Sequence, residues 1–426
     1  MCPDIKLHPL SAAQNEVWLA QQARPANPCF NIAQFTRING PIDPAIFETA
    51  LRQIIDEANA LRLRLVNDAG GIRQRIDDNR QWKMPFIDVS TQVDPHAAAV
   101  AWMSAERQQN VDPLHNSLFC YALLKLSPAQ FLWYHRYHHI IMDGYGRLLI
   151  MRRLAAVYSA LLRRQPPEPC PFRPIERMFE SDARYRSSVQ RIEDERYWLE
   201  RCAKLPKPVS FSEQRAPASA NCITQTFHAS RPVAGDGHRR RLAAIATAAM
   251  AAYLYRYTGA PELLLCLVVN ARIGENRWIP GLICNGLILR LPVRANMSLS
   301  SLVELSAAQI DEGLEHQQYR IGDLHRALEC THGQRIFGPT INLMPDFTNL
   351  LFAGHTTSTV SFAPGSVSDI HMTVHDRSDG QPLQVDLNAN PIVYRMGDLI
   401  THRKRLAACL HALTHTPSST VAGIMR

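Results

Sequence analysis

Residues 133–144 have the sequence WYHRYHHIIMDG, and this stretch decides how the chain is interpreted. The segment 130–137 predicts a β-strand because it is rich in aromatic and apolar residues. Side chains alternate along a strand, so we expect His135 and His139 on one face and His138 on the other. The next residues, Asp-Gly, predict a turn before a helix. A histidine where a strand meets a loop is well placed to face a cleft.

The residue types in this stretch point to acid–base chemistry. A neutral imidazole can take a proton from an attacking amine or hydroxyl, which accelerates a reaction by about 10²–10⁴-fold. Asp143 can orient an imidazole ring, or it can hold the loop through an ion pair with a distant arginine. Gly144 has no Cβ, so a ligand or another backbone segment can come close. We expect no metal, because no cysteine lies nearby and adjacent histidines on a strand point in opposite directions.

Composition sets the class of the protein. A chain of 426 residues exceeds the usual single-domain size, so we expect two domains or one fold of two similar lobes. With 46% hydrophobic and 20% charged residues, the chain is an ordinary globular protein and not a disordered, collagen-like or coiled-coil one. The formal net charge of +8 favours an anionic partner but does not identify it.

Cysteine spacing and hydropathy indicate the compartment. The ten cysteines form no C-x-x-C pair, and scattered cysteines in a long chain are typical of a reducing compartment. The first ten residues lack a signal-peptide pattern. The longest apolar run, 242–255, has 14 residues and is too short to span a bilayer. We therefore expect a cytoplasmic protein that does not bind membranes.

Local signals predict alternating helices and strands in both halves. Asp43-Pro44 and Asp94-Pro95 each predict a helix start, because aspartate is a good N-cap and proline fits the first turn. Five prolines within 165–174 break the pattern, and we place a boundary there between an N-terminal lobe, 1–172, and a C-terminal lobe, 173–426. The other expected helices are 145–164, 175–204, 238–257, 302–318 and 396–413, and the other expected strands are 117–126, 263–270, 282–291 and segments near residues 340 and 383.

The stretch H-H-x-x-x-D-G at residues 138–144 resembles the core motif of condensation domains of non-ribosomal peptide synthetases. The likeness covers nearly the whole chain. Residues 11–18, SAAQNEVW, look like the family's S-x-A-Q-x-R-L-W, with Glu16 where arginine is usual. Residues 281–285, GLICN, look like G-x-F-V-N, and residues 337–342, FGPTIN, fit a late motif. The chain departs from the family at Ala58-Asn59, where His-Glu is usual, and at 320–322, where Pro-Phe-Glu is usual.

The resemblance implies a fold and a reaction. The fold would be an α/β (α+β sandwich) of two chloramphenicol acetyltransferase-like lobes in a V with a tunnel between them. The reaction would be amide formation, in which an amine attacks an acyl thioester. The substrates would be presented on the 4'-phosphopantetheine arms of a donor carrier protein and an acceptor carrier protein, or the amine would be free. The protein itself would bind no cofactor, would be monomeric, and could adjoin neighbouring synthetase domains.

The resemblance also implies roles for particular residues. His139, the second histidine, would be catalytic, whereas His138 and Asp143 would be structural. Asp143 would pair with Arg272, with help from Arg62. The late motif would place Asn342 near the reacting groups. The details HHIIMDGYG and QYRIGDL are most similar to condensation domains of vibriobactin and enterobactin synthetases, which suggests siderophore biosynthesis and an aryl donor such as dihydroxybenzoyl.

Four other functions are compatible with parts of the pattern. An epimerisation domain shares H-H-x-x-x-D-G, and a docking module shares the fold but tends to lose the second histidine. A coenzyme A-dependent acyltransferase would also need D-F-G-W-G, where this chain has D-F-T-N at 346–349. Nucleic-acid binding is suggested only by charge, and no matching motif is present. The runs 239–241 and 403–405 are basic, and are either solvated helix faces or a surface that attracts acidic carriers.

Overall fold

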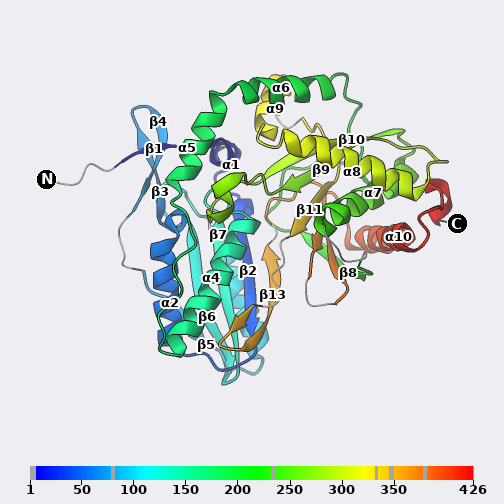
Figure 1. The fold of residues 1–426 in the computed structure, drawn as a ribbon. Helices are drawn as coiled ribbons and strands as arrows, with labels where there is room; N and C mark the ends of the chain where they lie inside the picture. Colours follow the sequence, from blue (N-terminus) through cyan, green and yellow to red (C-terminus); the bar gives the residue numbers. More distant parts are fainter. Residues whose placement is uncertain are drawn as a thin grey trace. The chain divides into compact units, whose positions relative to one another are not determined.

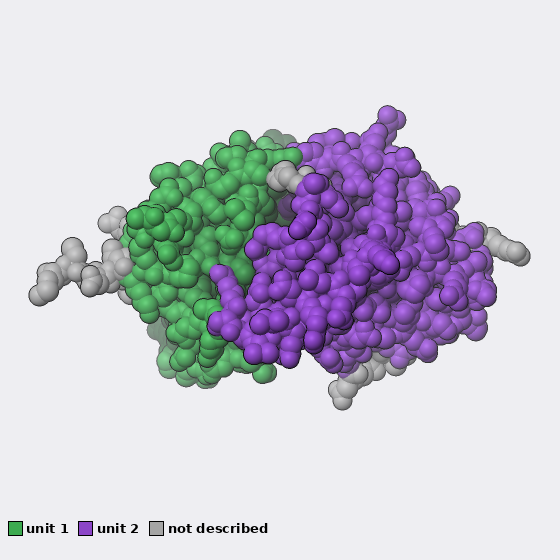
Figure 2. Space-filling model, turned by 90° about the horizontal axis from the view of Figure 1, so that it is seen from above, with its two compact units in different colours: residues 1–184, 272–283, 347–365 green, residues 185–271, 284–346, 366–426 purple. Residues whose placement is uncertain are grey.

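The computed structural model describes residues 6–77, 82–231, 237–331, 334–344, 350–363, 365–377 and 381–425. The chain forms two compact units, and each contains a mixed six-stranded sheet with helices packed against it (Figures 1 and 2). Unit 1 comprises 1–184, 272–283 and 347–365, and unit 2 comprises 185–271, 284–346 and 366–426. The two expected α/β units are therefore present. The predicted single boundary at residue 172 does not separate them, because the later segments 272–283 and 347–365 also belong to unit 1.

The sheet of unit 1 has the strand order β12-β13-β2-β7-β6-β5. Its strands are β2 (Asn31–Ile38), β5 (Phe86–Asp88), β6 (Phe119–Ser127), β7 (Gln130–His138), β12 (Leu351–Phe352) and β13 (His355–Ala363). β13 pairs antiparallel with β2, with Thr359 opposite Thr36. A local sequence pattern cannot show this pairing, because the two strands are more than 300 residues apart.

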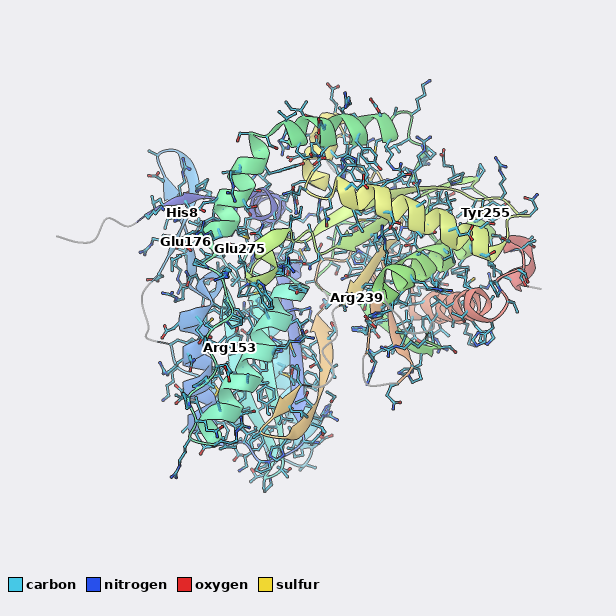
Figure 3. All side chains as sticks on the ribbon, viewed as in Figure 1. His8, Arg153, Glu176, Arg239, Tyr255 and Glu275 are labelled. Atoms are coloured by element: carbon cyan, nitrogen blue, oxygen red, sulfur yellow. The ribbon has the colours of Figure 1, made fainter. Side chains whose placement is uncertain are left out.

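Helices cover both faces of this sheet. The core on one face includes residues of α2 (Pro44–Glu57) and α4 (Gly144–Leu162), and the core on the other includes residues of α3 (Pro95–Arg107). Asp43 and Asp94 cap α2 and α3 as predicted: Asp43 accepts two backbone N–H groups of the first turn, and Asp94 accepts one. Arg153 on α4, labelled in Figure 3, pairs with Glu57 on α2 at 2.6 Å and ties the two helices together.

Unit 1 also contains a smaller sheet and the N-terminal helix. A three-stranded sheet contains β1 (His8–Pro9), β3 (Leu63–Asp68) and β4 (Gly71–Ile76). The motif at residues 11–18 lies on α1 (Ala12–Gln22), which begins with a capping box between Ser11 and Gln14. Gln14 is buried and hydrogen-bonds Gln74 at 2.8 Å, so this motif has a packing role in unit 1.

The sheet of unit 2 has the order β10-β9-β11-β14-β15-β8. Its strands are β8 (Ile223–Ala229), β9 (Glu262–Val269), β10 (Asn285–Pro292), β11 (Thr340–Met344), β14 (Ile370–His375) and β15 (Leu383–Ala389). The helices of this unit include α7 (His238–Thr258), α8 (Leu299–Glu315), α9 (Ile321–Ala327) and α10 (Met396–His415). The 14-residue apolar run lies within α7, and all of its residues from 242 to 254 are buried, so the run forms the core part of this helix. None of the helices in the described ranges has the length and apolarity needed to cross a membrane.

One predicted helix is wrong. The segment 175–204 forms two helices, α5 (Glu176–Arg186) and α6 (Val189–Arg201). Ser188 breaks the segment, because its hydroxyl accepts the Arg191 N–H as the N-cap of α6. Serine favours such caps over helix interiors, so the pair Ser187-Ser188 was the available signal.

Candidate active site

The motif turn is built around Asp143, which follows β7 and caps α4. Its Oδ1 accepts the Gly146 N–H at 2.8 Å, and its own N–H donates to the Gly281 carbonyl at 3.2 Å. Oδ2 accepts the Ile283 N–H at 2.9 Å. Asp143 therefore joins the start of α4 to the later segment 272–283, and the carboxylate is only 1% exposed.

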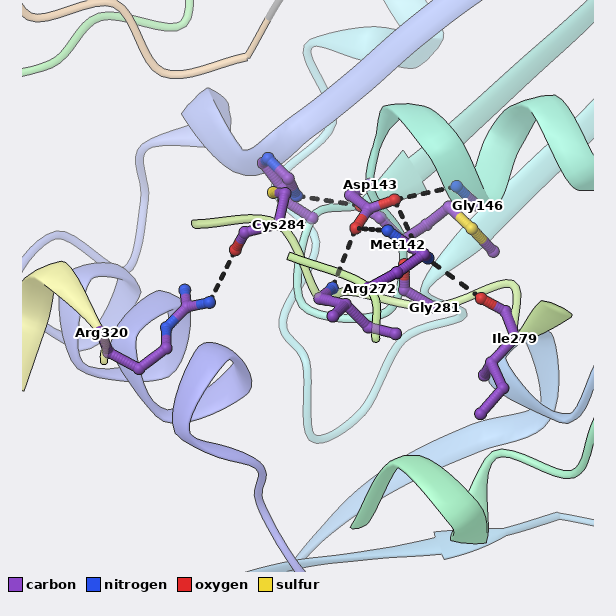
Figure 4. Close-up of polar contacts among 10 residues, drawn as sticks. Met142, Asp143, Gly146, Arg272, Ile279, Gly281, Cys284 and Arg320 are labelled. Atoms are coloured by element: carbon purple, nitrogen blue, oxygen red, sulfur yellow. Dashed lines mark hydrogen bonds and ion pairs between the residues drawn. The ribbon is translucent and has the colours of Figure 1, made fainter. Parts of the chain in front are cut away.

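Arg272 neutralises this carboxylate through a bidentate ion pair. Its Nη1 lies 2.8 Å from Asp143 Oδ2, and its Nη2 lies 2.9 Å from Oδ1 (Figure 4). Nη2 also donates to the Gly281 carbonyl at 3.0 Å, and the guanidinium lies over the Tyr145 ring at 5.0 Å. Burial alone would raise the pKa of Asp143, but the charge and hydrogen bonds of Arg272 outweigh it and hold that pKa below its ordinary value. The predicted pairing of Asp143 with Arg272 is confirmed.

A glycine lets these two segments approach closely. A Cβ on Gly146 would lie 2.8 and 2.9 Å from the Gly281 backbone N and O, and 2.6 Å from Met142 Sδ. Such distances are too short for a side chain, so only glycine fits. The sequence analysis gave this role to Gly144, which is the first residue of α4 and half-buried. In the structure, the glycine that lets the segment around Gly281 come close is Gly146, two residues after Gly144.

His139 lies just beyond the end of β7, in the turn. Its backbone N–H donates to the Phe30 carbonyl at 2.7 Å, and its Nδ1 lies 2.9 Å from the Met142 carbonyl. A carbonyl oxygen can only accept, so Nδ1 carries the proton and Nε2 keeps its lone pair. Burial lowers the pKa of His139, partly opposed by the negative charge of Asp143, so the ring is neutral near pH 7. The side chain is half-buried, and with the proton on Nδ1 the Nε2 lone pair is the basic site of the ring.

The two other histidines have different environments. His138 is 1% exposed, and its Nδ1 accepts the Ile140 N–H at 3.2 Å. Burial, with the neighbouring His139 and Arg136, lowers the pKa of His138 to about 3. His135 is fully buried and stacks on Trp133 with the ring centroids 4.2 Å apart. The different environments predicted for His138 and His139 are confirmed, but His139 lies past the strand end, so it does not share a strand face with His135.

The remaining predicted site residues lie elsewhere. Arg62 follows α2 in unit 1, where it hydrogen-bonds Asn59 Oδ1 at 2.9 Å and the Asp56 carbonyl at 3.3 Å. Its support of the Asp143–Arg272 pair stays a prediction. Asn342 lies on β11 of unit 2, opposite Val268 and Thr373. Its predicted place near the reacting groups also stays a prediction.

The motif residues of unit 2 have structural roles. Asn285 donates to the carbonyls of Gln317 and Tyr319 at 2.9 and 2.7 Å, and it accepts the Ile321 N–H at 3.2 Å. Arg320, which departs from the family pattern, donates to the Cys284 carbonyl at 2.7 Å (Figure 4). These contacts hold the start of α9 against the start of β10. The D-F-T-N segment at 346–349 lies outside the described residues.

Sequence reasoning missed the backbone groups that shape the site. The Met142 carbonyl fixes the tautomer of His139, and the Gly281 carbonyl accepts from both Asp143 and Arg272. A side-chain pattern carries no signal for a carbonyl. The second glycine of D-G-Y-G was a usable signal for Gly146. In the described part of the chain, no group of three or more His, Cys, Asp or Glu residues could hold a metal ion.

Comparison with known proteins identifies the family. The model of the Condensation domain matches residues 5–425. A dimodular nonribosomal peptide synthase of Bacillus subtilis (strain 168) is 36% identical over 96% of this chain, and an isonitrile lipopeptide synthase of Streptomyces coeruleorubidus is 35% identical over 96%. The chain spans only 18% and 28% of the lengths of these two relatives. Enterobactin synthase component F of Escherichia coli (strain K12) is 28% identical over 96% of this chain and 32% of its own length.

Solved structures share the whole fold. A starter condensation domain of rhizomide synthetase RzmA, in complex with C8-CoA and Leu-SNAC, has a TM-score of 0.94 and 45% identity, covering 97% of this chain and 96% of that one. The first condensation domain of the calcium-dependent antibiotic synthetase, in complex with a substrate analogue, has a TM-score of 0.89 and 29% identity, covering 98% of each chain. With the motif, the fold and the family model in agreement, this chain belongs to the condensation-domain family of non-ribosomal peptide synthetases.

Proposed function

We propose that this chain is a starter condensation domain, which transfers an acyl group from a thioester to the amine of an aminoacyl thioester. Condensation domains form amide bonds, and the solved domains at 44–45% identity are starter domains. The observation that carries the proposal is the state of His139. Its Nδ1–H is held by the Met142 carbonyl, so a neutral Nε2 can accept a proton from the attacking amine.

The proposed step balances as a thioester aminolysis. The amine nitrogen attacks the thioester carbonyl carbon, and its proton moves to His139 Nε2. The tetrahedral intermediate then expels the thiolate, which takes up the proton. An α-amine has a pKa of about 7.7–8.0, so part of it is already neutral near pH 7. Proton removal by the base contributes about 3–5 kcal/mol, whereas holding amine and thioester together contributes about 7–11 kcal/mol. His139 therefore also orients the amine.

The donor in this proposal is a short acyl thioester. The C8-CoA complexes were solved with RzmA variants in which one arginine is replaced by alanine. In two of these variants a histidine eight positions before that arginine is also replaced by alanine. In this chain, Arg147 follows His139 by eight positions, whereas the residues eight positions after His135 and His138 are Asp143 and Gly146. We therefore match Arg147 to that arginine. Because this chain retains it, we expect a long acyl chain to be excluded.

A siderophore donor is the second candidate. The relatives include enterobactin synthase component F and, at 25% identity, a vanchrobactin synthetase of Vibrio anguillarum, which favours an aryl donor such as dihydroxybenzoyl. The higher identity to the starter domains supports the acyl donor instead.

Carrier proteins and neighbouring domains are part of the proposal. The curated relatives are much longer than this chain, which supports partners that present substrates on phosphopantetheine arms. The basic run at 239–241 is partly neutralised, because Arg239 lies 3.4 Å from Asp376 and Arg240 pairs with Asp311. This run is therefore better explained as a helix end held by ion pairs than as a free docking surface.

The test combines the protein with acetyl-, octanoyl- and dihydroxybenzoyl thioesters and a panel of aminoacyl thioesters. Mass spectrometry should detect an N-acylated aminoacyl product with the short acyl donor. We expect His139→Ala to lower turnover by about 10²–10⁴-fold. Exclusive use of the dihydroxybenzoyl donor would favour the second candidate, and absence of any amide would contradict both.

A further inference from the structure

A cavity of about 470 Å³ lies entirely within unit 2. One wall comes from residues 202–215, which follow the end of α6, and the other comes from residues 328–336, which follow α9 and lead to β11. Its volume is within the range of about 300–1,000 Å³ that is typical of small-molecule sites. No residue of the motif at 138–144 lines this cavity, so it is separate from the site around His139.

Contacts on both sides hold the walls of this cavity in place. Arg290 on β10 donates to the carbonyls of Arg201 and Ala203 at 3.2 and 3.1 Å, which fixes the chain where it leaves α6. A Cβ on Gly338 would overlap the Val209 carbonyl oxygen, so the two wall segments approach each other closely where the second one enters β11. The cavity is therefore formed before any ligand arrives.

The inner lining of the cavity is apolar. Ile336 is 3% exposed, and Leu205 and Leu328 are half-buried. Two thiols join them, the buried Cys202 and the half-buried Cys330. Burial raises the pKa of Cys202 to about 11 and also raises the pKa of Cys330, so both thiols are uncharged near pH 7. This lining suits an apolar group, because burying apolar surface is favourable.

The charged lining residues are all basic. Lys207 and Arg215 are exposed, Arg335 is half-buried, and none of the described lining residues is acidic. Asp369 compensates Arg335 at 3.1 Å, whereas neither Lys207 nor Arg215 has an ion pair within the described ranges. They are not needed to stabilise the carbonyls at the end of α6, because Arg290 already binds these. Two uncompensated positive charges therefore lie beside an apolar cavity.

We propose that this cavity is a binding site for a small amphipathic anion, with a carboxylate at Lys207 and Arg215 and an apolar group against Leu205, Leu328 and Ile336. The planar guanidinium of arginine matches a carboxylate in shape and charge. A neutral apolar molecule would leave both charges unpaired, and a cation would be repelled. Fatty acids and N-acyl amino acids share the required chemistry. The inference goes beyond the proposed function and does not depend on it.

The Cys330 thiol provides a local reporter, because it lines the cavity and a bound ligand should shield it. The test measures the rate at which N-ethylmaleimide modifies Cys330 in the whole chain, by mass spectrometry of its peptide, with the exposed Cys170 of unit 1 as internal control. Octanoate and N-acetylleucine are compared with octanol and octylammonium. A carboxylate should protect Cys330 at about 5- to 30-fold lower concentration than octanol, since each exposed ion pair contributes up to about a factor of five. Octylammonium should not protect it, and the rate at Cys170 should not change.

The order of the two carboxylates identifies the source of the ligand. Stronger protection by octanoate would support a fatty acid, and stronger protection by N-acetylleucine would support an N-acyl amino acid. Equal protection by octanol, or no protection by either carboxylate, would overturn the inference. The readout is binding at Cys330 and not amide formation, so failure of the proposed function would leave this test valid.

A double variant then assigns the charge preference to residues. Lys207→Gln combined with Arg215→Gln removes both uncompensated charges at exposed positions, where unfolding is not expected. The advantage of the carboxylate over octanol should shrink by about 5-fold or more. Lys404→Gln, at an exposed position of α10 in the same unit, should leave this advantage unchanged. A wild-type advantage in the double variant would contradict the proposed site.

Discussion

Asp143 and Arg272 meet through two parallel N–H···O bonds of 2.8 and 2.9 Å although 129 residues separate them. Both side chains are almost completely buried. The segment 272–283 thereby belongs to unit 1, while the chain on either side of it belongs to unit 2. The carboxylate of Asp143 therefore fixes the turn between His139 and α4 against the segment 272–283.

Removing one partner of this pair should destabilise unit 1. Asp143→Asn would leave the Arg272 guanidinium buried without a full counter-charge, at a cost of about 3–5 kcal/mol. We expect a lower urea midpoint together with lower turnover. Glu48→Gln, which breaks an exposed ion pair with Arg52, is a control and should cost less than about 1 kcal/mol. Equal effects of the two substitutions would show that the buried pair is unimportant for stability.

Gly146→Ala tests the close approach of the motif helix to residue 281. The added Cβ would meet the Gly281 backbone at 2.8 Å, so the two segments must move apart. We expect a loss of about 1–3 kcal/mol in the free energy of unfolding, and reduced turnover because Asp143 would shift. Gly397→Ala on α10, where no atom lies within 4 Å of the new Cβ, should be neutral or slightly stabilising. Thermal unfolding of both variants provides the comparison.

The sequence predicts local structure well where an element is determined by its own helix cap or by the periodicity of its apolar residues. The Asp-Pro starts of α2 and α3 and the strands β6 and β7 are confirmed, because each depends on neighbouring residues. The pairing of β13 with β2 and the membership of residues 272–283 in unit 1 were not predicted. These features depend on contacts between distant segments, which a local pattern does not encode.

The same distinction applies to the site. The Asp143–Arg272 pair was predicted through the family resemblance and is confirmed. The alternation rule failed at His139 because the strand ends at His138. The Met142 carbonyl, which sets the tautomer of His139, is a backbone group that every residue type carries. Arg147 falls within the expected helix 145–164, and only the structure shows that its side chain is buried.

Arg147→Ala should broaden the range of donors. Arg147 is a buried residue of α4, and the C8-CoA complexes of the RzmA domain were obtained with the matched arginine replaced by alanine. We expect octanoyl-CoA to gain at least about 10-fold in kcat/KM relative to acetyl-CoA, because a longer alkyl chain then finds apolar contacts. Competition between the two donors, read by mass spectrometry, measures this ratio. An unchanged ratio would show that Arg147 does not limit chain length.

The pH profile of kcat/KM should contain a limb that belongs to His139. Its pKa lies below the ordinary 6.5 because of burial, so the ring is a competent base at neutral pH and becomes protonated only at lower pH. Activity should therefore fall on acidification below pH 6.5. A second limb, from the acceptor amine with a pKa of about 7.7–8.0, should lie at higher pH. In His139→Ala the residual activity should keep only the amine limb; persistence of both limbs would assign the lower one to another group.

Acid stability provides a test of His138 that is separate from catalysis. Its pKa is about 3 in the folded chain against 6.5 for a free histidine, so between these values the unfolded chain binds a proton that the folded chain does not. Stability must then fall as the pH falls through this window, by up to about 1.4 kcal/mol per pH unit. His138→Asn removes this titration, and its Oδ1 can still accept the Ile140 N–H. We expect the variant to be less stable at pH 7, because the smaller side chain packs less well, but to lose less stability on acidification. Urea midpoints measured between pH 3 and 6.5 give the pH dependence of stability for the wild type and for the variant. The same dependence in both proteins would mean that the buried ring becomes protonated without unfolding.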